Sequence, residues 1–141
     1  MKSVCLIIGA GAGIGGHVGQ RFAREGYHVV LCRRSDADGL ETLVKMIEGD
    51  GGSAEGRLLN IVDENAIEGL VLDIEKNTGP IEVVVHNIGA QIGNRSLTDT
   101  PLKTFELGWR LSCFSLFRLA YAVLPIMAER GKGTLLVTSS T

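Results

Sequence analysis

Apolar residues along the chain alternate between short continuous runs and longer amphipathic stretches. The runs Val4–Ile8, Val29–Cys32 and Ile81–Val85 carry little polarity, which is typical of strands buried on both faces of a parallel sheet. Two further strands are predicted, one within Arg57–Val62 and one over Thr134–Ser139. The pattern therefore predicts about five strands.

The stretches between these strands have the periodicity of helices. Their expected apolar faces are Ile14, Val18 and Phe22; then Leu40, Leu43, Val44 and Ile47; then Ile67, Leu70, Val71 and Ile74. Ser35, with Asp38 three residues later, resembles a capping box, and Asp63 is expected to cap the third helix. Thr100-Pro101 predicts the start of a long helix over roughly residues 102–129, with proline at its first position.

Strands that alternate with helices indicate right-handed βαβ units and a parallel sheet. The chain has 141 residues and contains no linker, repeat or low-complexity segment. We therefore expect a single α/β domain over residues 1–141.

Composition narrows the classes of partner. With 45% apolar and 21% charged residues the chain is typical of a globular protein, and its net charge of −2 argues against nucleic acid or an anionic membrane as a partner. Cys5, Cys32 and Cys113 lie far apart, and neither disulfide nor metal-ligand spacing is present. No apolar stretch is expected to reach the length of a membrane span, so we expect a cytoplasmic protein. The residue spacing predicts no metal site.

A glycine-rich loop, GAGAGIGG from Gly9 to Gly16, joins the first strand to the first helix. Two spacings fit it, GxGxxG beginning at Gly11 and GxxxGxG beginning at Gly9. The strand ends at Ile8, so the tight turn begins at Gly9, which favours the second spacing. In either case the loop suits the pyrophosphate of a dinucleotide, because the backbone approaches closely and a helix N-terminus faces the charge.

The end of the second strand discriminates between dinucleotides. A site for NAD usually has an acidic residue there to bind the ribose hydroxyls. This chain instead has Arg33-Arg34, and arginine suits a 2′-phosphate through charge-assisted contacts. The pair therefore favours NADP(H) over NAD(H), although a solvated basic pair is the alternative interpretation.

Several segments together resemble the short-chain dehydrogenase/reductase family. Ile8–Gly15 is similar to the family's TGxxxGIG loop, with Ile8 in place of threonine, and His86–Gly89 is similar to its NNAG motif. Phe105–Pro125 has the spacing of the family's long interface helix, and Gly133–Ser140 resembles its fifth strand. The resemblance covers the whole chain and implies a Rossmann-like, doubly wound sheet with strand order 3-2-1-4-5, truncated relative to the family.

The resemblance also implies roles for individual residues. Carried over by position, the cofactor-binding residues are Gly9, Gly13, Ile14, Gly15, Arg33, Arg34, Asn60, Ile61, Asn87 and Gly89. Ser140 stands at the position of the serine that orients the substrate, and Ser112 at that of an asparagine that helps a proton relay.

The family's catalytic YxxxK motif is not found in these 141 residues, because neither Tyr27 nor Tyr121 has a lysine four residues later. In the family this tyrosine donates the proton that reduction of a carbonyl needs. We therefore expect the cofactor-binding half of an NADP(H)-dependent oxidoreductase for an alcohol or carbonyl substrate, inactive by itself. The alternatives are a non-catalytic nucleotide-binding or regulatory module and a remnant that binds no cofactor.

The long helix is apolar over much of its circumference. Its large apolar residues are Leu107, Trp109, Leu111, Phe114, Phe117, Leu119 and Val123. Only one side of such a helix faces the sheet, so the other apolar side predicts a homo-oligomer formed through residues 102–129. The resemblance implies the same surface.

Overall fold

The structure is a computed structural model that describes residues 1–89 and 95–139. Its strands are β1 (Val4–Ile8), β2 (His28–Arg33), β3 (Ser53–Leu58), β4 (Ile81–His86) and β5 (Thr134–Val137). All neighbouring strands are parallel, and their order in the sheet is β3-β2-β1-β4-β5. The predicted Rossmann-like fold and strand order are confirmed.

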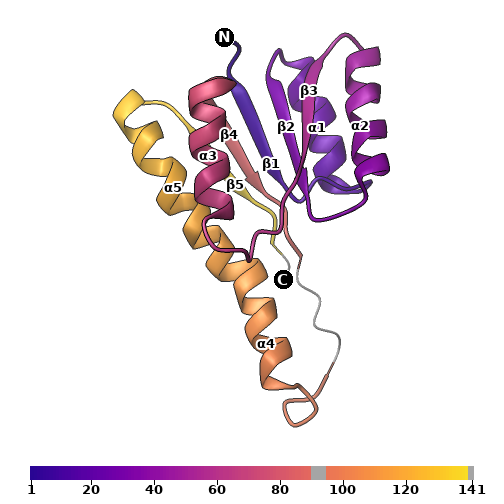
Figure 1. Cartoon of the computed structure of the whole chain (residues 1–141), viewed down its shortest axis with the longest axis vertical. Coiled ribbons are helices and arrows are strands. Elements are labelled where there is room, and N and C mark those ends of the chain that lie inside the picture. Colours follow the sequence, from indigo (N-terminus) through magenta and orange to yellow (C-terminus); the bar gives the residue numbers. More distant parts are fainter. Residues whose placement is uncertain (90–94, 140–141) are drawn as a thin grey trace.

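Helices cover both faces of the sheet (Figure 1). They are α1 (Ile14–Arg24), α2 (Ala37–Gly49), α3 (Ala66–Asn77), α4 (Leu102–Trp109) and α5 (Ser115–Arg130). Helices α1 and α2 lie on one face, and α3 and α5 on the other. A π-helical turn over Arg110–Phe114 joins α4 to α5, and α4 extends beyond the sheet. We call this segment the π turn.

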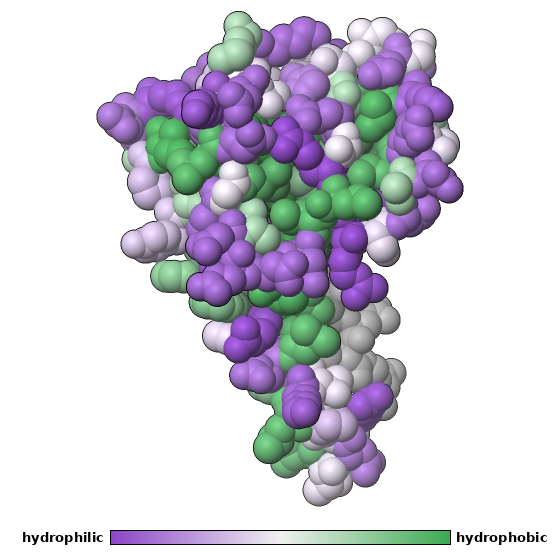
Figure 2. All heavy atoms as spheres, viewed as in Figure 1, coloured by the Kyte–Doolittle hydropathy of each residue, from purple (hydrophilic) through white to green (hydrophobic). Residues whose placement is uncertain are grey.

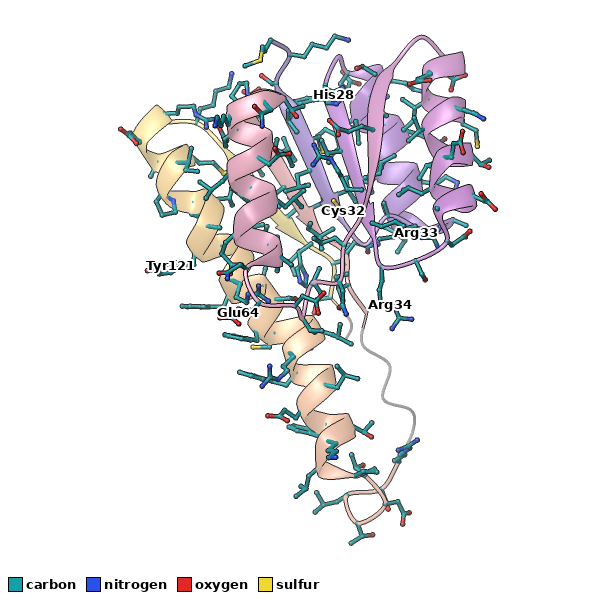
Figure 3. The ribbon with its side chains drawn as sticks, viewed as in Figure 1. His28, Cys32, Arg33, Arg34, Glu64 and Tyr121 are labelled. Atoms are coloured by element: carbon teal, nitrogen blue, oxygen red, sulfur yellow. The ribbon has the colours of Figure 1, made fainter. Side chains whose placement is uncertain are left out.

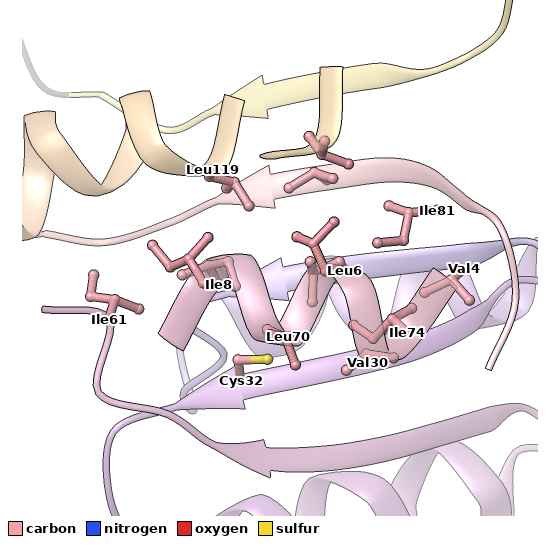
Figure 4. Close-up of a cluster of buried hydrophobic side chains, with 14 of the residues drawn as sticks. Val4, Leu6, Ile8, Val30, Cys32, Ile61, Leu70, Ile74, Ile81 and Leu119 are labelled. Carbon is pink, nitrogen blue, oxygen red and sulfur yellow. The ribbon is translucent and has the colours of Figure 1, made fainter. Parts of the chain in front are cut away.

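The central strand β1 is buried along its whole length, because helices cover both of its faces. Leu6 and Ile8 contribute to the core cluster beneath α3 and α5, where Ile74 and Leu119 meet them (Figure 4). On the other face, Ile7 belongs to the cluster beneath α1 and α2. Each such side chain stabilises the fold by roughly 1.5–3 kcal/mol through burial.

Helix α1 packs on the sheet through its smallest residues. The predicted apolar face is wrong at Ile14, whose side chain is 64% exposed, whereas Gly15, Gly19 and Ala23 are buried. A Cβ atom on Gly19 would lie 2.7 Å from Cδ2 of Leu31, so a larger residue would push the helix outward. The glycines, rather than the isoleucine, define the packed face.

Strand β3 begins and ends earlier than the predicted segment within residues 57–62. It covers Ser53–Leu58 at the edge of the sheet, where polar residues are tolerated. At Gly56, a Cβ would come within 2.6 Å of Cγ of Leu40, so this strand packs closely under α2. The apolar signal that misled the prediction belongs to the following loop, where Ile61 is buried.

The predicted helix caps are also wrong. Asp36, not Ser35, caps α2, and its side chain accepts a hydrogen bond of 3.0 Å from the Gly39 N–H. Asp36 adopts a left-handed backbone with φ of 67°, which short polar residues tolerate. The cap of α3 is Asn65 without a side-chain bond, and Asp63 contributes only its carbonyl oxygen.

The long helix runs from Leu102 to Arg130, close to the predicted range, with Pro101 at its cap rather than at its first position. By length and composition alone it could cross a membrane, so the expectation that no stretch reaches that length is wrong. The buried residues Leu119 and Met127 pack in the core beneath it. Core packing thus accounts for part of its apolar character.

Replacement of a core residue of α3 tests this packing. Ile74→Ala removes a fully buried side chain, and we expect the free energy of unfolding to fall by about 2–5 kcal/mol. Leu72→Ala on the same helix is the control, because Leu72 is 65% exposed and its loss is expected to change stability by less than about 0.5 kcal/mol. Urea unfolding followed by circular dichroism measures both; equal losses would contradict the arrangement of α3.

Candidate nucleotide-binding site

The turn after β1 is built from backbone atoms that approach each other closely. Gly9 has φ of +97°, and a Cβ there would lie 2.1 Å from the carbonyl oxygen of Asn87. A Cβ on Gly15 would lie 2.1 Å from the carbonyl oxygen of Gly9. Both positions therefore require glycine, and the tight turn begins at Gly9, as the GxxxGxG spacing assumes.

Gly13 differs from these two glycines, because a Cβ there would meet no atom within 4 Å. It caps α1 without a side-chain hydrogen bond, so the first helical N–H groups have no partner within the helix. His17 turns its Nδ1 toward the Gly13 carbonyl oxygen at 2.8 Å. The open space beside a helix N-terminus fits an anion such as a pyrophosphate.

A cleft lies at the carboxyl ends of β1 and β2, beside the point where the strand order reverses. It is lined by Ile8, Gly9, Cys32, Arg33, Arg34, Leu59, Asn60, Ile61, Ile88 and Leu111. In doubly wound sheets this position binds ligands. Burial raises the pKa of the Cys32 thiol to about 12, so this side chain is a neutral wall of the cleft and not a nucleophile.

The two arginines after β2 have different surroundings. Arg33 forms an ion pair of 3.3 Å with Asp36, the residue that caps α2. Arg34 has no ion-pair partner within the described ranges 1–89 and 95–139. In Figure 3, Arg33 lies toward the base of α2 and Arg34 extends from the end of β2 into open space.

Asn60 and Ile61 form the wall of the cleft opposite β1. The amide oxygen of Asn60 accepts a hydrogen bond of 3.3 Å from the Val62 N–H, so it is turned toward its own loop. Leu59 donates its N–H to the Arg33 carbonyl oxygen at 2.9 Å, which ties this loop to the end of β2. The structure therefore brings Asn60, Ile61 and both arginines to one cleft.

Asn87 connects three parts of the site. Its Nδ2 donates to the Gly9 carbonyl oxygen at 3.0 Å, and its Oδ1 accepts from the Thr138 hydroxyl at 2.7 Å. Asn87 thus fastens the glycine turn to the end of β5. Gly89 is exposed, and a Cβ there would meet nothing, so the described contacts require no glycine at this position.

A buried hydrogen-bonded chain that sequence reasoning missed runs from β4 into the π turn. Ser115 donates its N–H to the Arg110 carbonyl oxygen and its hydroxyl to that of Leu111 at 2.5 Å. His86, 2% exposed, therefore donates from Nε2 to the Ser115 hydroxyl at 2.8 Å. Its Nδ1 has no partner among the described residues, and burial lowers its pKa, which keeps the ring neutral.

Of the two predicted catalytic serines, only Ser112 lies within the described residues, and it is not among those that line the cleft. The Ser112 hydroxyl donates to the Gly108 carbonyl oxygen of its own helix at 2.7 Å. Ser112 and its neighbours in the π turn form an unusual helical geometry that often marks functional sites. Ser140 lies outside the described residues, and so does any contact it makes.

Taken together, these residues can bind a dinucleotide but offer little acid–base chemistry. The glycine turn and helix N-terminus can accept a charged phosphate, and Arg34, which has no ion-pair partner among the residues that the structure describes, provides a cation at the cleft. Within the described part of the chain no grouping of His, Cys, Asp and Glu could hold a metal ion. His86 is sealed in the core, so it cannot exchange a proton with a ligand in the cleft.

Comparison with known proteins supports this assignment. The model of the short chain dehydrogenase family matches residues 3–141. A putative ketoacyl reductase of Streptomyces coelicolor is 32% identical to the chain, covering 99% of the chain and 54% of that protein. The 7alpha-hydroxysteroid dehydrogenase of Escherichia coli is also 32% identical, over 96% of the chain and 52% of the enzyme.

Solved structures give the same result. A structure of actinorhodin polyketide ketoreductase with NADPH superposes with a TM-score of 0.89 at 30% identity, covering 99% of this chain and 53% of that one. A 7 alpha-hydroxysteroid dehydrogenase complexed with NADH has a TM-score of 0.89 at 31% identity, with 98% and 53% covered. The chain spans about half the length of the curated relatives it matches. It belongs to the short-chain dehydrogenase family and corresponds to the N-terminal portion of its members.

Proposed function

We propose that the chain binds NADP(H) and is the cofactor-binding half of an oxidoreductase acting on an alcohol or carbonyl. The observation that carries this proposal is the turn at Gly9, Gly13 and Gly15, which opens beside a helix N-terminus and a cleft at the carboxyl ends of the strands. The related structures contain a nicotinamide dinucleotide, NADPH in one and NADH in another.

The preference for NADP(H) rests on Arg34. Arg34 lines the cleft and has no carboxylate partner among the described residues, whereas Asp36 is engaged with Arg33 and with the Gly39 N–H. The carboxylate of Asp36, which could otherwise accept a hydrogen bond from a ribose hydroxyl, is thus already engaged. A 2′-phosphate would provide an anionic partner for the guanidinium group of Arg34.

Single arginine substitutions test this preference. Arg34→Ala is expected to weaken NADPH binding about tenfold or more and to leave NADH binding unchanged, because a hydrogen bond to a charged group contributes about 1.5–3 kcal/mol. Arg33→Ala is the matched control and is expected to have a smaller effect, since its charge is already paired with Asp36. Fluorescence titration with both nucleotides gives the dissociation constants. Wild-type protein that binds NADH as tightly as NADPH would refute the proposed preference.

Hydride transfer also requires a proton donor. The 141 residues contain no Tyr-x-x-x-Lys segment, His86 is buried, and the exposed His17 lies at the phosphate side of the site against the Gly13 carbonyl oxygen. We therefore expect the purified chain to bind NADPH without oxidising it in the presence of aldehydes or ketones, as followed by NADPH absorbance. Turnover at an ordinary enzymatic rate would show that residues 1–141 contain a proton donor, and would overturn this view.

We also propose that two copies associate through the exposed side of the long helix. Figure 2 shows apolar side chains along the part of this helix that extends beyond the sheet. Phe117 and Tyr121 are 64% and 75% exposed and stack on each other, and Trp109 stacks on Phe114. Exposed aromatic pairs of this kind are typical of protein interfaces.

Charge introduced on this face tests the association. The double substitution Phe117→Glu and Tyr121→Glu is expected to shift the protein to a monomer, because it would bury unpaired carboxylates between the copies. Leu72→Glu, at an equally exposed apolar position on α3, is expected to leave the oligomer intact. Sedimentation velocity measures the result. A wild-type monomer at micromolar concentration would contradict the proposed interface.

A further inference from the structure

Arg118 lies where α5, α3 and the loop after β3 meet. Its side chain is only 12% exposed, although it carries a full charge. Its Nε and Nη2 donate to the two carboxylate oxygens of Glu68 on α3 at 2.9 and 2.8 Å. This bidentate pair holds the guanidinium plane in one orientation.

The same guanidinium group also holds the loop after β3. Its Nη1 donates to the Ile61 carbonyl oxygen at 2.5 Å, and its Nη2 donates to that of Asp63 at 2.9 Å. The Arg118 side chain therefore donates four hydrogen bonds, two to Glu68 on α3 and two to backbone carbonyl oxygens of the loop. The contact with Arg118 lowers the pKa of Glu68, so both partners remain charged at neutral pH.

The loop that Arg118 holds is one wall of the nucleotide cleft. Asn60 and Ile61 line the cleft, while the other end of the loop is tied through the Leu59 N–H to the Arg33 carbonyl oxygen. The wall is thus fixed at two points, one on β2 and one on α5. Ile61 lines the cleft and its carbonyl oxygen accepts from Arg118, so a displacement of Arg118 would also displace this wall of the cleft.

We propose that Arg118 is a positioning residue for nucleotide binding, which sets the wall formed by Asn60 and Ile61 at the distance the dinucleotide requires. The residue touches no nucleotide itself and acts through the loop carbonyls. This inference rests on the proposed function, because it needs a nucleotide in the cleft.

Arg130 provides a matched control on the same helix. It also pairs with a glutamate of α3, Glu75, and it also donates to a backbone carbonyl oxygen, that of Ile81 at 3.4 Å. Ile81 begins β4, at the end of the sheet opposite to the cleft. Arg118 and Arg130 therefore make similar links between α5 and α3, but only Arg118 reaches the wall of the nucleotide site.

Three variants separate positioning from general stability. Arg118→Lys keeps a positive charge near Glu68, but an ammonium group lacks the planar fork that serves the carboxylate and both carbonyls together. Glu68→Gln keeps the Arg118 side chain but replaces the bidentate carboxylate with an amide that has a single acceptor oxygen. Arg130→Gln breaks the equivalent link away from the cleft.

The readout is the dissociation constant of NADPH, measured by fluorescence at a temperature where circular dichroism shows each variant folded. We expect Arg118→Lys to weaken binding roughly tenfold, Glu68→Gln to weaken it less than Arg118→Lys does, and Arg130→Gln to stay within about twofold of wild type. Hydrogen exchange adds a readout without nucleotide: the amides of residues 61–63 are expected to exchange faster in Arg118→Lys than in Arg130→Gln.

The possible results are distinguishable. If wild-type protein binds no dinucleotide, the proposed function fails and this inference fails with it. If the wild type binds and Arg118→Lys binds equally well, only the positioning role is overturned. If all three variants lose affinity to the same degree, the link between α5 and α3 acts through stability, and the specific role of Arg118 is again overturned.

Discussion

The close approach of backbone to backbone around Gly9 is the constraint on which the rest of the site depends. Gly9 touches the carbonyl of Asn87, and Gly15 touches the carbonyl of Gly9, so β1, α1 and β4 meet without side chains between them. The Asn87 side chain then fastens the turn by a hydrogen bond to the Gly9 carbonyl. The helix N-terminus can face a phosphate because these three elements converge within a few ångströms.

The sequence predicts the buried centre of the fold better than its edges. Strands β1, β2 and β4 are covered on both faces, so their residues are apolar without interruption and the pattern identifies them. Strand β3 lies at the edge, and its sequence SAEGRL has no such pattern. The prediction that Ile14 is buried is wrong for a related reason: where helix and sheet touch through glycine, hydrophobic periodicity does not mark the packed face.

At the site, the sequence predicts what depends on residue type but not what depends on long-range contacts. Gly9 and Gly15 are recognisable because no other residue fits at these two positions. The different surroundings of Arg33 and Arg34 arise from Asp36 in a left-handed conformation, which the sequence pattern does not reveal. The bonds of His86 to Ser115 and of Arg118 to the loop join residues far apart in the chain, so periodicity and motif spacing carry no information about them.

The π turn affects the way the long helix can tolerate change in length. A single turn of this kind is equivalent to one residue inserted into an α-helix, and the wider turn takes up the extra residue so that the flanking helices keep nearly the same rotation about the axis. Loss of one residue within Arg110–Phe114 would therefore restore a regular helix and leave the buried side of α5 facing the sheet. Loss of one residue within the regular part of α5 would instead rotate the residues on either side of it by about 100° relative to each other. We therefore expect single-residue deletions to be accepted more readily in the π turn than in α5.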